Sequence, residues 1–202
     1  MPNPQRAAMG LRAHSGWAAL VVVAGPARSP SVIDRRRIEL ITPGIPKQPY
    51  HAAEKLELKE AQKLVERCAE TASRLAQKAL RAVQSDLRGQ GYEVSGCGVL
   101  LGSGRSSSTL AATLASHALI HNAEGELFRN ALQQASKRCG MPFLGVLDRE
   151  VYERGAADLR VAIDKLKQHI SEMGRTVGPP WTQDQKRAAV VAWLVLASSA
   201  RL

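Results

Sequence analysis

The chain has 202 residues, of which 45% are hydrophobic and 4% aromatic, and its 28 lysines and arginines against 18 acidic residues give a formal net charge of +10. This apolar content predicts one domain with a substantial core, preceded by a flexible segment over residues 1–8 and with a linker over 174–181. No stretch approaches the roughly 18–20 consecutive apolar residues of a membrane span, so we expect no membrane contact. The basic charge favours an anionic partner such as nucleic acid, the alternative being a generally basic surface.

The cysteines predict a reducing compartment. Their number is odd and their spacing matches no zinc or redox motif, so we interpret them as buried apolar side chains of a cytoplasmic protein. The three are Cys68, Cys97 and Cys139. The apolar run 17–24 follows basic residues, as in a signal peptide, but it is short and a polar strand follows it. We therefore interpret this run as a β-strand.

Three strands are predicted within the first 41 residues. Residues 9–14 and 17–24 flank a turn at Ser15-Gly16, and the second strand is a continuous apolar run suited to a sheet covered on both faces. Residues 31–41 form a third strand. Its polar middle, from Asp34 to Arg37, indicates a sheet edge or an exposed face.

Helices and strands alternate in the rest of the chain. The predicted elements are a long helix over 52–88, a strand over 92–101, a helix over 109–139, a strand over 142–147, a helix over 149–173 interrupted near Gly155, and a last helix ending near Ser198. The last helix starts at a capping box, with Thr182 as N-cap and Gln185 reaching back. Consecutive strands imply an antiparallel meander, whereas strands separated by helices imply parallel neighbours. The sequence thus predicts an α/β fold, a mixed five-stranded sheet with helices on both faces.

Two short stretches, GLRAHSGWAAL over 10–20 and TQDQKRAAVVAWLVL over 182–196, resemble segments of the Holliday-junction resolvases of the ribonuclease H-like superfamily. The segment GLRAHSGWAAL over 10–20 is similar to their first hairpin, in which Gly-Trp or Gly-Tyr opens the second strand. The segment TQDQKRAAVVAWLVL over 182–196 is similar to their terminal helix, in which an Asp precedes an alanine-rich apolar run. Together with the element order, this resemblance implies a ribonuclease H-like fold.

The chain departs from that superfamily in its acidic residues. The resemblance implies catalytic metals held by converging carboxylates, one of them on the first strand, because Mg²⁺ and Mn²⁺ prefer hard oxygen ligands. Here no acidic residue precedes Asp34, and the first strand carries Arg12 and His14. Asp184 matches a family acidic position, the alternative being a charge that favours a helix start. The resemblance therefore implies a divergent bacterial family that lacks the first-strand catalytic Asp and binds, scaffolds or regulates.

Three polar residues fall on the side of helix 109–139 that its apolar residues predict to be buried. They are His117, His121 and Glu124, at positions i, i+4 and i+7. The apolar stripe consists of Leu110, Leu114, Phe128 and Leu132. Buried polar groups need partners, so the cluster is a satisfied network opposed by polar residues of the first three strands, a catalytic pocket, or a transition-metal site.

The Gly-rich turn before this helix is a candidate anion site. It consists of Gly102, Ser103, Gly104 and Arg105. Backbone N–H groups of such a turn and a guanidinium can bind phosphate, and ligands of open α/β sheets bind beyond the carboxyl ends of the strands. The turn has neither a Walker A sequence nor the GxSxG of serine hydrolases. The alternative is an ordinary turn followed by an N-cap within 106–109.

Basic residues of the first and third strands are further phosphate-binding candidates, because guanidinium groups pair with phosphate oxygens. They are Arg12, His14, Arg35 and Arg36. The alternative for the third strand is a solvated face of mixed charge.

These observations favour a catalytically reduced protein that binds nucleic acid or a phosphate-bearing ligand. A second hypothesis is an enzyme that uses His117, His121 and Glu124 for metal-assisted or acid–base hydrolysis, with a divalent metal held by the two histidines or Asp184. A third is a protein-interaction module that docks a protein partner on helix 52–88, which an exposed apolar stripe would signal.

Overall fold

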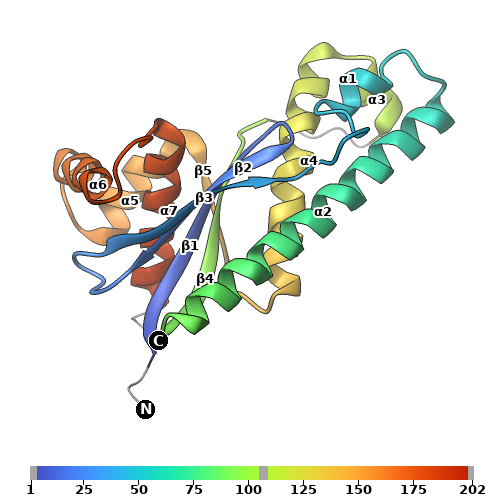
Figure 1. Cartoon of the computed structure of the whole chain (residues 1–202). Helices are drawn as coiled ribbons and strands as arrows, with labels where there is room; N and C mark the ends of the chain where they lie inside the picture. Colours follow the sequence, from blue (N-terminus) through green and yellow to red (C-terminus); the bar gives the residue numbers. More distant parts are fainter. Residues whose placement is uncertain (1–3, 105–108, 200–202) are drawn as a thin grey trace.

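The computed structural model describes residues 4–104 and 109–199. The strands are β1 (Gln5–His14), β2 (Trp17–Ala24), β3 (Ser31–Glu39), β4 (Tyr92–Leu101) and β5 (Phe143–Leu147). The helices are α1 (Pro49–Ala53), α2 (Leu58–Gly89), α3 (Leu110–Leu114), α4 (His117–Arg138), the 3₁₀ turn η1 (Asp148–Glu150), α5 (Val151–Leu159), α6 (Ile163–Val177) and α7 (Gln183–Ser199). Figure 1 shows α2 and α4 on one side of the sheet and α5, α6 and α7 on the other.

The sheet has the order β3-β2-β1-β4-β5. The first three strands are antiparallel neighbours, and β4 and β5 continue the sheet in parallel with β1. This arrangement confirms the mixed five-stranded sheet with helices on both faces. The hairpin closes where His14 pairs with Trp17, and Gly16 adopts a φ of 83° in the turn. The polar strand β3 lies at the sheet edge, as its composition predicted.

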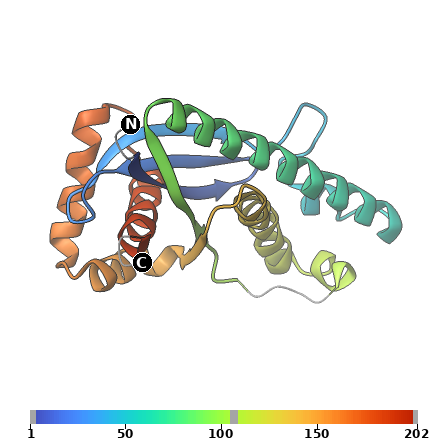
Figure 2. The same ribbon diagram turned by 90° about the horizontal axis from the view of Figure 1, so that it is seen from below.

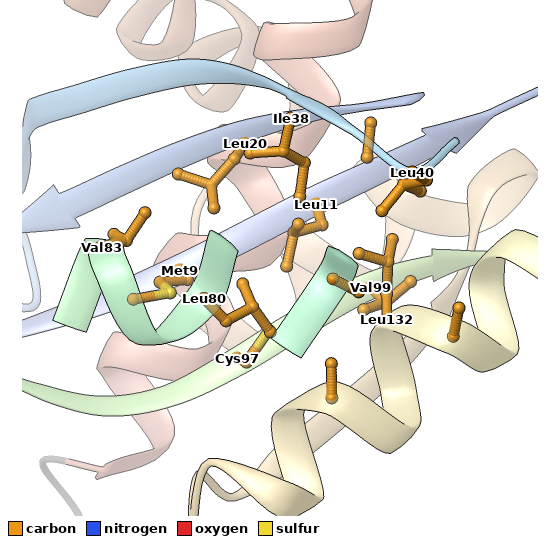
Figure 3. Close-up of a cluster of buried hydrophobic side chains, with 14 of the residues drawn as sticks. Met9, Leu11, Leu20, Ile38, Leu40, Leu80, Val83, Cys97, Val99 and Leu132 are labelled. Atoms are coloured by element: carbon orange, nitrogen blue, oxygen red, sulfur yellow. The ribbon is translucent and has the colours of Figure 1, made fainter. Parts of the chain in front are cut away.

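A hydrophobic core lies between the sheet and the helices α2 and α4 (Figure 3). Because side chains alternate along a strand, every second residue of β1, such as Met9 and Leu11, enters this core. Leu80 and Val83 of α2 and Leu132 of α4 close it from the helical side. The apolar stripe of α2 is therefore buried in the core, and the exposed apolar residues near its start are Leu56 and Leu58.

A second core lies between the opposite face of the sheet and α7, which α5 and α6 cover in turn (Figure 2). Helix α7 lies very close to the sheet because glycines of β1 and β4 face it. A Cβ added at Gly10 would lie 1.9 Å from the carbonyl oxygen of Ala188, and one added at Gly98 would lie 2.8 Å from Cγ2 of Val191. The predicted capping box is present, since Thr182 N donates to Gln185 Oε1 at 2.8 Å.

Two of the predicted long helices are each split into a short and a long helix. The helix expected over 52–88 consists of α1 and α2 with a turn between them. The helix expected over 109–139 consists of α3 and α4, because Ser116 takes an extended conformation (φ −138°, ψ 115°). A residue in this conformation is typical of a helix N-cap, and it resets the phase of the helix that follows. The apolar stripe of α3 therefore does not continue into α4.

The helix expected over 149–173 is interrupted at a different place. Gly155 lies inside α5, close to Val190 and Leu166, whereas the chain breaks after Arg160, which adopts a left-handed φ of 57°. Strand β1 begins at Gln5, inside the segment expected to be flexible, and α6 extends to Val177, into the expected linker. None of the helices described within 4–104 and 109–199 is long and apolar enough to cross a membrane.

Candidate functional site

The carboxyl end of β1 presents two polar side chains to the α7 side of the sheet. Leu11 points into the core under α2, so its neighbour Arg12 points the other way, as does His14. The ring of His14 stacks on Trp17 of β2, with 4.3 Å between the ring centroids and 9° between the planes. The guanidinium of Arg37 lies 3.9 Å from the centroid of the Trp17 ring. These contacts fix the orientation of His14 and leave Trp17 sandwiched between two groups.

Carboxylates from two other elements meet Arg12. Its Nη2 donates to Oδ2 of Asp148, the first residue after β5, at 2.9 Å. Its Nη1 donates to Oδ1 of Asp184, in the first turn of α7. Arg187, one turn further along α7, donates to Asp148 Oδ1 at 2.8 Å, and His14 Nε2 lies 3.1 Å from Asp184 Oδ1. We call Arg12, His14, Asp148, Asp184 and Arg187 the arginine–aspartate cluster.

The cluster stabilises the charged forms of Asp148 and Arg12. Burial raises the pKa of Asp148, but hydrogen bonds and charge from Arg187 and Arg12 outweigh this effect, so the pKa lies below its usual value. Burial lowers the pKa of Arg12, but the two aspartates outweigh burial and raise it. Arg12 and Arg187 therefore neutralise Asp148 and Asp184, and each side chain of the cluster is 22–31% exposed. Part of each side chain thus faces solvent.

A further guanidinium lies beside the Gly-rich turn that follows β4. A Cβ added at Gly102 would lie 2.7 Å from Nη2 of Arg129, a residue of α4. Burial lowers the pKa of Arg129, and the charges of Glu126 and Asp148 only partly offset this effect. Within 4–104 and 109–199, no residue accepts a hydrogen bond from its guanidinium. Arg129 is therefore a partly desolvated cation that lacks an acceptor among the described residues.

The Gly-rich turn itself is described only in part. Gly102, Ser103 and Gly104 are exposed, and Gly104 approaches the side chain of Asn122. Arg105 and the three serines after it lie outside the described residues. Thr109 is the N-cap of α3, and its side chain accepts from Ala112 N at 3.2 Å. The phosphate-binding role predicted for this turn stays a prediction.

Two arginines of β3 are committed to other contacts. Arg35 donates to the carbonyl oxygens of Val177, Gly178, Pro179 and Pro180. Arg36 pairs with Asp34 at 2.7 Å and with Asp86 of α2 at 2.8 Å. Both guanidinium groups therefore have protein partners, and the geometry favours structural roles over the predicted phosphate contacts.

The predicted cluster on α4 is rearranged. Glu124 is buried, but His117 and His121 are exposed, because the first turns of α4 lie before the part of the helix that enters the core, which begins at Leu127. The partners expected from the first three strands are also wrong. Instead, Glu124 Oε1 accepts from Tyr50 N at 2.8 Å and from His51 N at 3.0 Å, and it lies 3.1 Å from His51 Nδ1. Burial raises the pKa of Glu124 more than these hydrogen bonds lower it.

Comparison with solved structures identifies the architecture. The chain is similar to a structure of RuvC from Thermus thermophilus, with a TM-score of 0.54 and 14% identity over 96% of this chain and 95% of that chain. It is also similar to T. thermophilus RuvC in complex with a Holliday junction substrate, with a TM-score of 0.55 and 13% identity over 97% and 95% of the two chains. The fold is ribonuclease H-like. No protein-family model and no curated protein matches the sequence.

The metals that a ribonuclease H-like fold implies do not fit the arginine–aspartate cluster. A site for two divalent metals needs several carboxylate oxygens directed at the ions. Here Asp148 and Asp184 accept from arginines, and β1 contributes the guanidinium of Arg12. A cation bound to both carboxylates occupies the place that a metal would need and repels a metal placed beside it.

Sequence reasoning missed four of the residues that these sites use. Arg12, His14 and Asp184 were candidates, but the structure adds Asp148 and Arg187 to their cluster, Arg129 beside it and His51 opposite Glu124. A signal existed for Asp148, because an acidic residue directly after a strand lies at its carboxyl end. No local pattern distinguished the other three.

Proposed function

We propose that the chain is a nucleic-acid-binding protein of ribonuclease H-like fold that contacts phosphates at the carboxyl ends of β1 and β4 and does not cleave its ligand. The observation that carries this proposal is the position of Arg12, whose guanidinium lies between the carboxylates of Asp148 and Asp184. The guanidinium of Arg12 neutralises carboxylates that would otherwise repel a phosphate, so an anion can approach this end of the sheet without a metal. It also removes the oxygen ligands that metal-dependent hydrolysis needs.

Arg129 is the residue that we expect to bind a phosphate most directly. Arg12 and Arg187 already neutralise Asp148 and Asp184, so Arg129 has no hydrogen-bonded carboxylate within residues 4–104 and 109–199. A desolvated guanidinium without an acceptor gains more from an anion than a solvated one. Phosphate oxygens would provide the acceptors that the described residues do not.

The net charge and the structural neighbours support nucleic acid as the class of ligand. A formal charge of +10 attracts polyanions over the whole surface. The RuvC neighbour is described in complex with a Holliday junction substrate, and its fold is shared by this chain. Branched DNA is therefore the first ligand to test, with duplex DNA, single-stranded DNA and RNA beside it.

The test is a set of binding and cleavage assays with fluorescently labelled nucleic acids. Binding should weaken steeply as salt rises, because bound phosphates release counterions. The ligand should stay intact when Mg²⁺ or Mn²⁺ is added. Arg129→Ala should weaken binding about tenfold and reduce the salt slope by about one.

The matched control is Arg28→Ala. Arg28 is exposed and follows β2, at the opposite end of the sheet. Its substitution therefore removes one positive charge at a position far from the proposed site. Equal effects of the two substitutions would mean that binding depends on overall charge and not on this site. No binding at low salt would overturn the proposal, and metal-dependent cleavage would contradict its non-cleaving part.

A further inference from the structure

Three of the five histidines of the chain come together between α1 and α4. They are His51, His117 and His121, and one ring nitrogen from each lies within 4.8 Å of the others. The two histidines of α4 are one turn apart, with their Nε2 atoms 2.9 Å from each other. The ring centroid of His51 is 4.8 Å from that of His121 and 5.6 Å from that of His117.

We propose that His51, His117 and His121 form a binding site for one zinc ion. Imidazole nitrogens are ordinary ligands of zinc, and in a tetrahedral site with Zn–N bonds of about 2.0–2.1 Å they lie about 3.4 Å apart. The nitrogens of this group lie within 4.8 Å, so small side-chain rotations bring them to that spacing. His117 and His121 are exposed and have room for such rotations.

The histidine of α1 has the surroundings of a metal ligand. Its Nδ1 faces Glu124 Oε1 at 3.1 Å, so Nδ1 carries the proton that the carboxylate accepts and Nε2 keeps a free lone pair. In zinc sites a ligating histidine usually donates its other ring N–H to a carboxylate, which fixes the ring and strengthens its donor nitrogen. The same carboxylate oxygen accepts from two backbone N–H groups of α1, which holds His51 opposite α4.

The arrangement also indicates what kind of zinc site this is. Three protein ligands leave a fourth position free, and the exposure of His117 and His121 opens that position to water. Structural zinc sites have four protein ligands, whereas an open position is typical of sites at which the metal binds water or substrate. The site belongs to different elements from the arginine–aspartate cluster, so it stands independently of the proposed nucleic-acid binding.

Isothermal titration calorimetry of the chelator-treated full chain with Zn²⁺ tests this proposal. The wild-type chain should bind one Zn²⁺, and its thermal unfolding temperature should rise with Zn²⁺ concentration. His117→Ala and His121→Ala should each weaken binding by about 100-fold or more and abolish the thermal shift. Glu124→Gln should keep the stoichiometry of one and weaken binding by about 10- to 100-fold, because Glu124 orients His51 without contacting the metal.

The matched control is His169→Ala, which removes an imidazole that contacts Pro30 and Trp193 elsewhere in the fold. This variant should bind Zn²⁺ as the wild-type chain does. His117 and His121 are exposed, so their variants should fold, which circular dichroism checks. A wild-type stoichiometry well below one would overturn the proposal, as would unchanged affinity in His117→Ala and His121→Ala.

Discussion

Asp148 is held by two guanidinium groups, and its ionised form is therefore tied to the folded state. Arg12 and Arg187 donate to its two carboxylate oxygens at 2.9 and 2.8 Å. Their effect exceeds that of burial, so the pKa of Asp148 in the folded chain lies below the unfolded value of about 3.9. The carboxylate thus contributes stability that is present above the unfolded pKa and is lost as the pH falls through the folded pKa.

We expect Asp148→Asn to make the free energy of unfolding less sensitive to a fall in pH. At neutral pH the free energy of unfolding of the variant should be about 2 kcal/mol lower than that of the wild type, because two charged hydrogen bonds are weakened. Below about pH 4 this difference in the free energy of unfolding should become smaller. Urea denaturation across that pH range measures both effects. Asp164→Asn, at an exposed acidic residue, is the control. A difference in the free energy of unfolding between Asp148→Asn and the wild type that does not change with pH would contradict this coupling of ionisation to folding.

Residue identity alone predicted part of the candidate sites. Arg12, His14 and Asp184 were singled out because an arginine replaces an expected carboxylate and an aspartate opens a helix, and the structure brings them together. His51 could not be found in this way. Its contact with Glu124 joins positions 73 residues apart and depends on the turn between α1 and α2.

At the scale of elements, the contact between β1 and α7 depends on a residue without a side chain. A Cβ at Gly10 would lie 1.9 Å from the carbonyl oxygen of Ala188 and 2.8 Å from the backbone nitrogen of Ala192. Backbone atoms cannot rotate away as a flexible side chain can, so the helix must shift. We expect Gly10→Ala to lower the free energy of unfolding by about 3 kcal/mol, the upper end of typical overpacking costs.

Chemical denaturation of the variant measures this loss. Gly89→Ala is the matched control, because it makes the same substitution at the end of α2, where no atom lies within 4 Å of the added Cβ. That substitution should be neutral or slightly stabilising, since alanine favours the helix. A Gly10→Ala chain as stable as the wild type would show that α7 moves away from the sheet at little cost.

The positions of strands were more predictable than the continuity of helices. Strands β2 and β4 were predicted with their observed bounds, because apolar runs end at turn residues. The helix periodicity of 109–139 gave no sign of the break at Ser116, since serine is tolerated within helices and is also a common N-cap. The exposure of His117 and His121 was not predictable either, because the periodicity of a helix does not show which of its turns the sheet covers, and here the residues of α4 that enter the core begin at Leu127.

For the whole molecule, α7 contains a long uninterrupted run of buried residues. The residues from Ala188 to Leu196 are each at most 4% exposed, because the sheet covers one side of α7 and α5 and α6 cover the other. Their backbone amides should open only with global unfolding. We expect hydrogen exchange followed by mass spectrometry to show the slowest exchange in α7 and fast exchange in α3, a five-residue helix with one buried residue.

The control for this measurement is the long helix α2, which is buried along one side only. Its amides should exchange faster than those of α7 and more slowly than those of α3. Exchange in α7 as fast as in α3 would mean that the second core opens on its own.

The overall topology could be predicted without knowledge of individual side-chain contacts. It followed from the order of elements and the connection rules for sheets, and the similarity to RuvC agrees with it.

The guanidinium of Arg12 has a consequence for how the protein responds to its surroundings. A metal ion is taken from solution, so a centre that relies on one gains and loses charge as the ion supply changes. Arg12 is bonded to the chain itself and its pKa is raised, so its charge is present whenever the protein is folded. A ligand held at this end of the sheet would remain held in a chelating buffer.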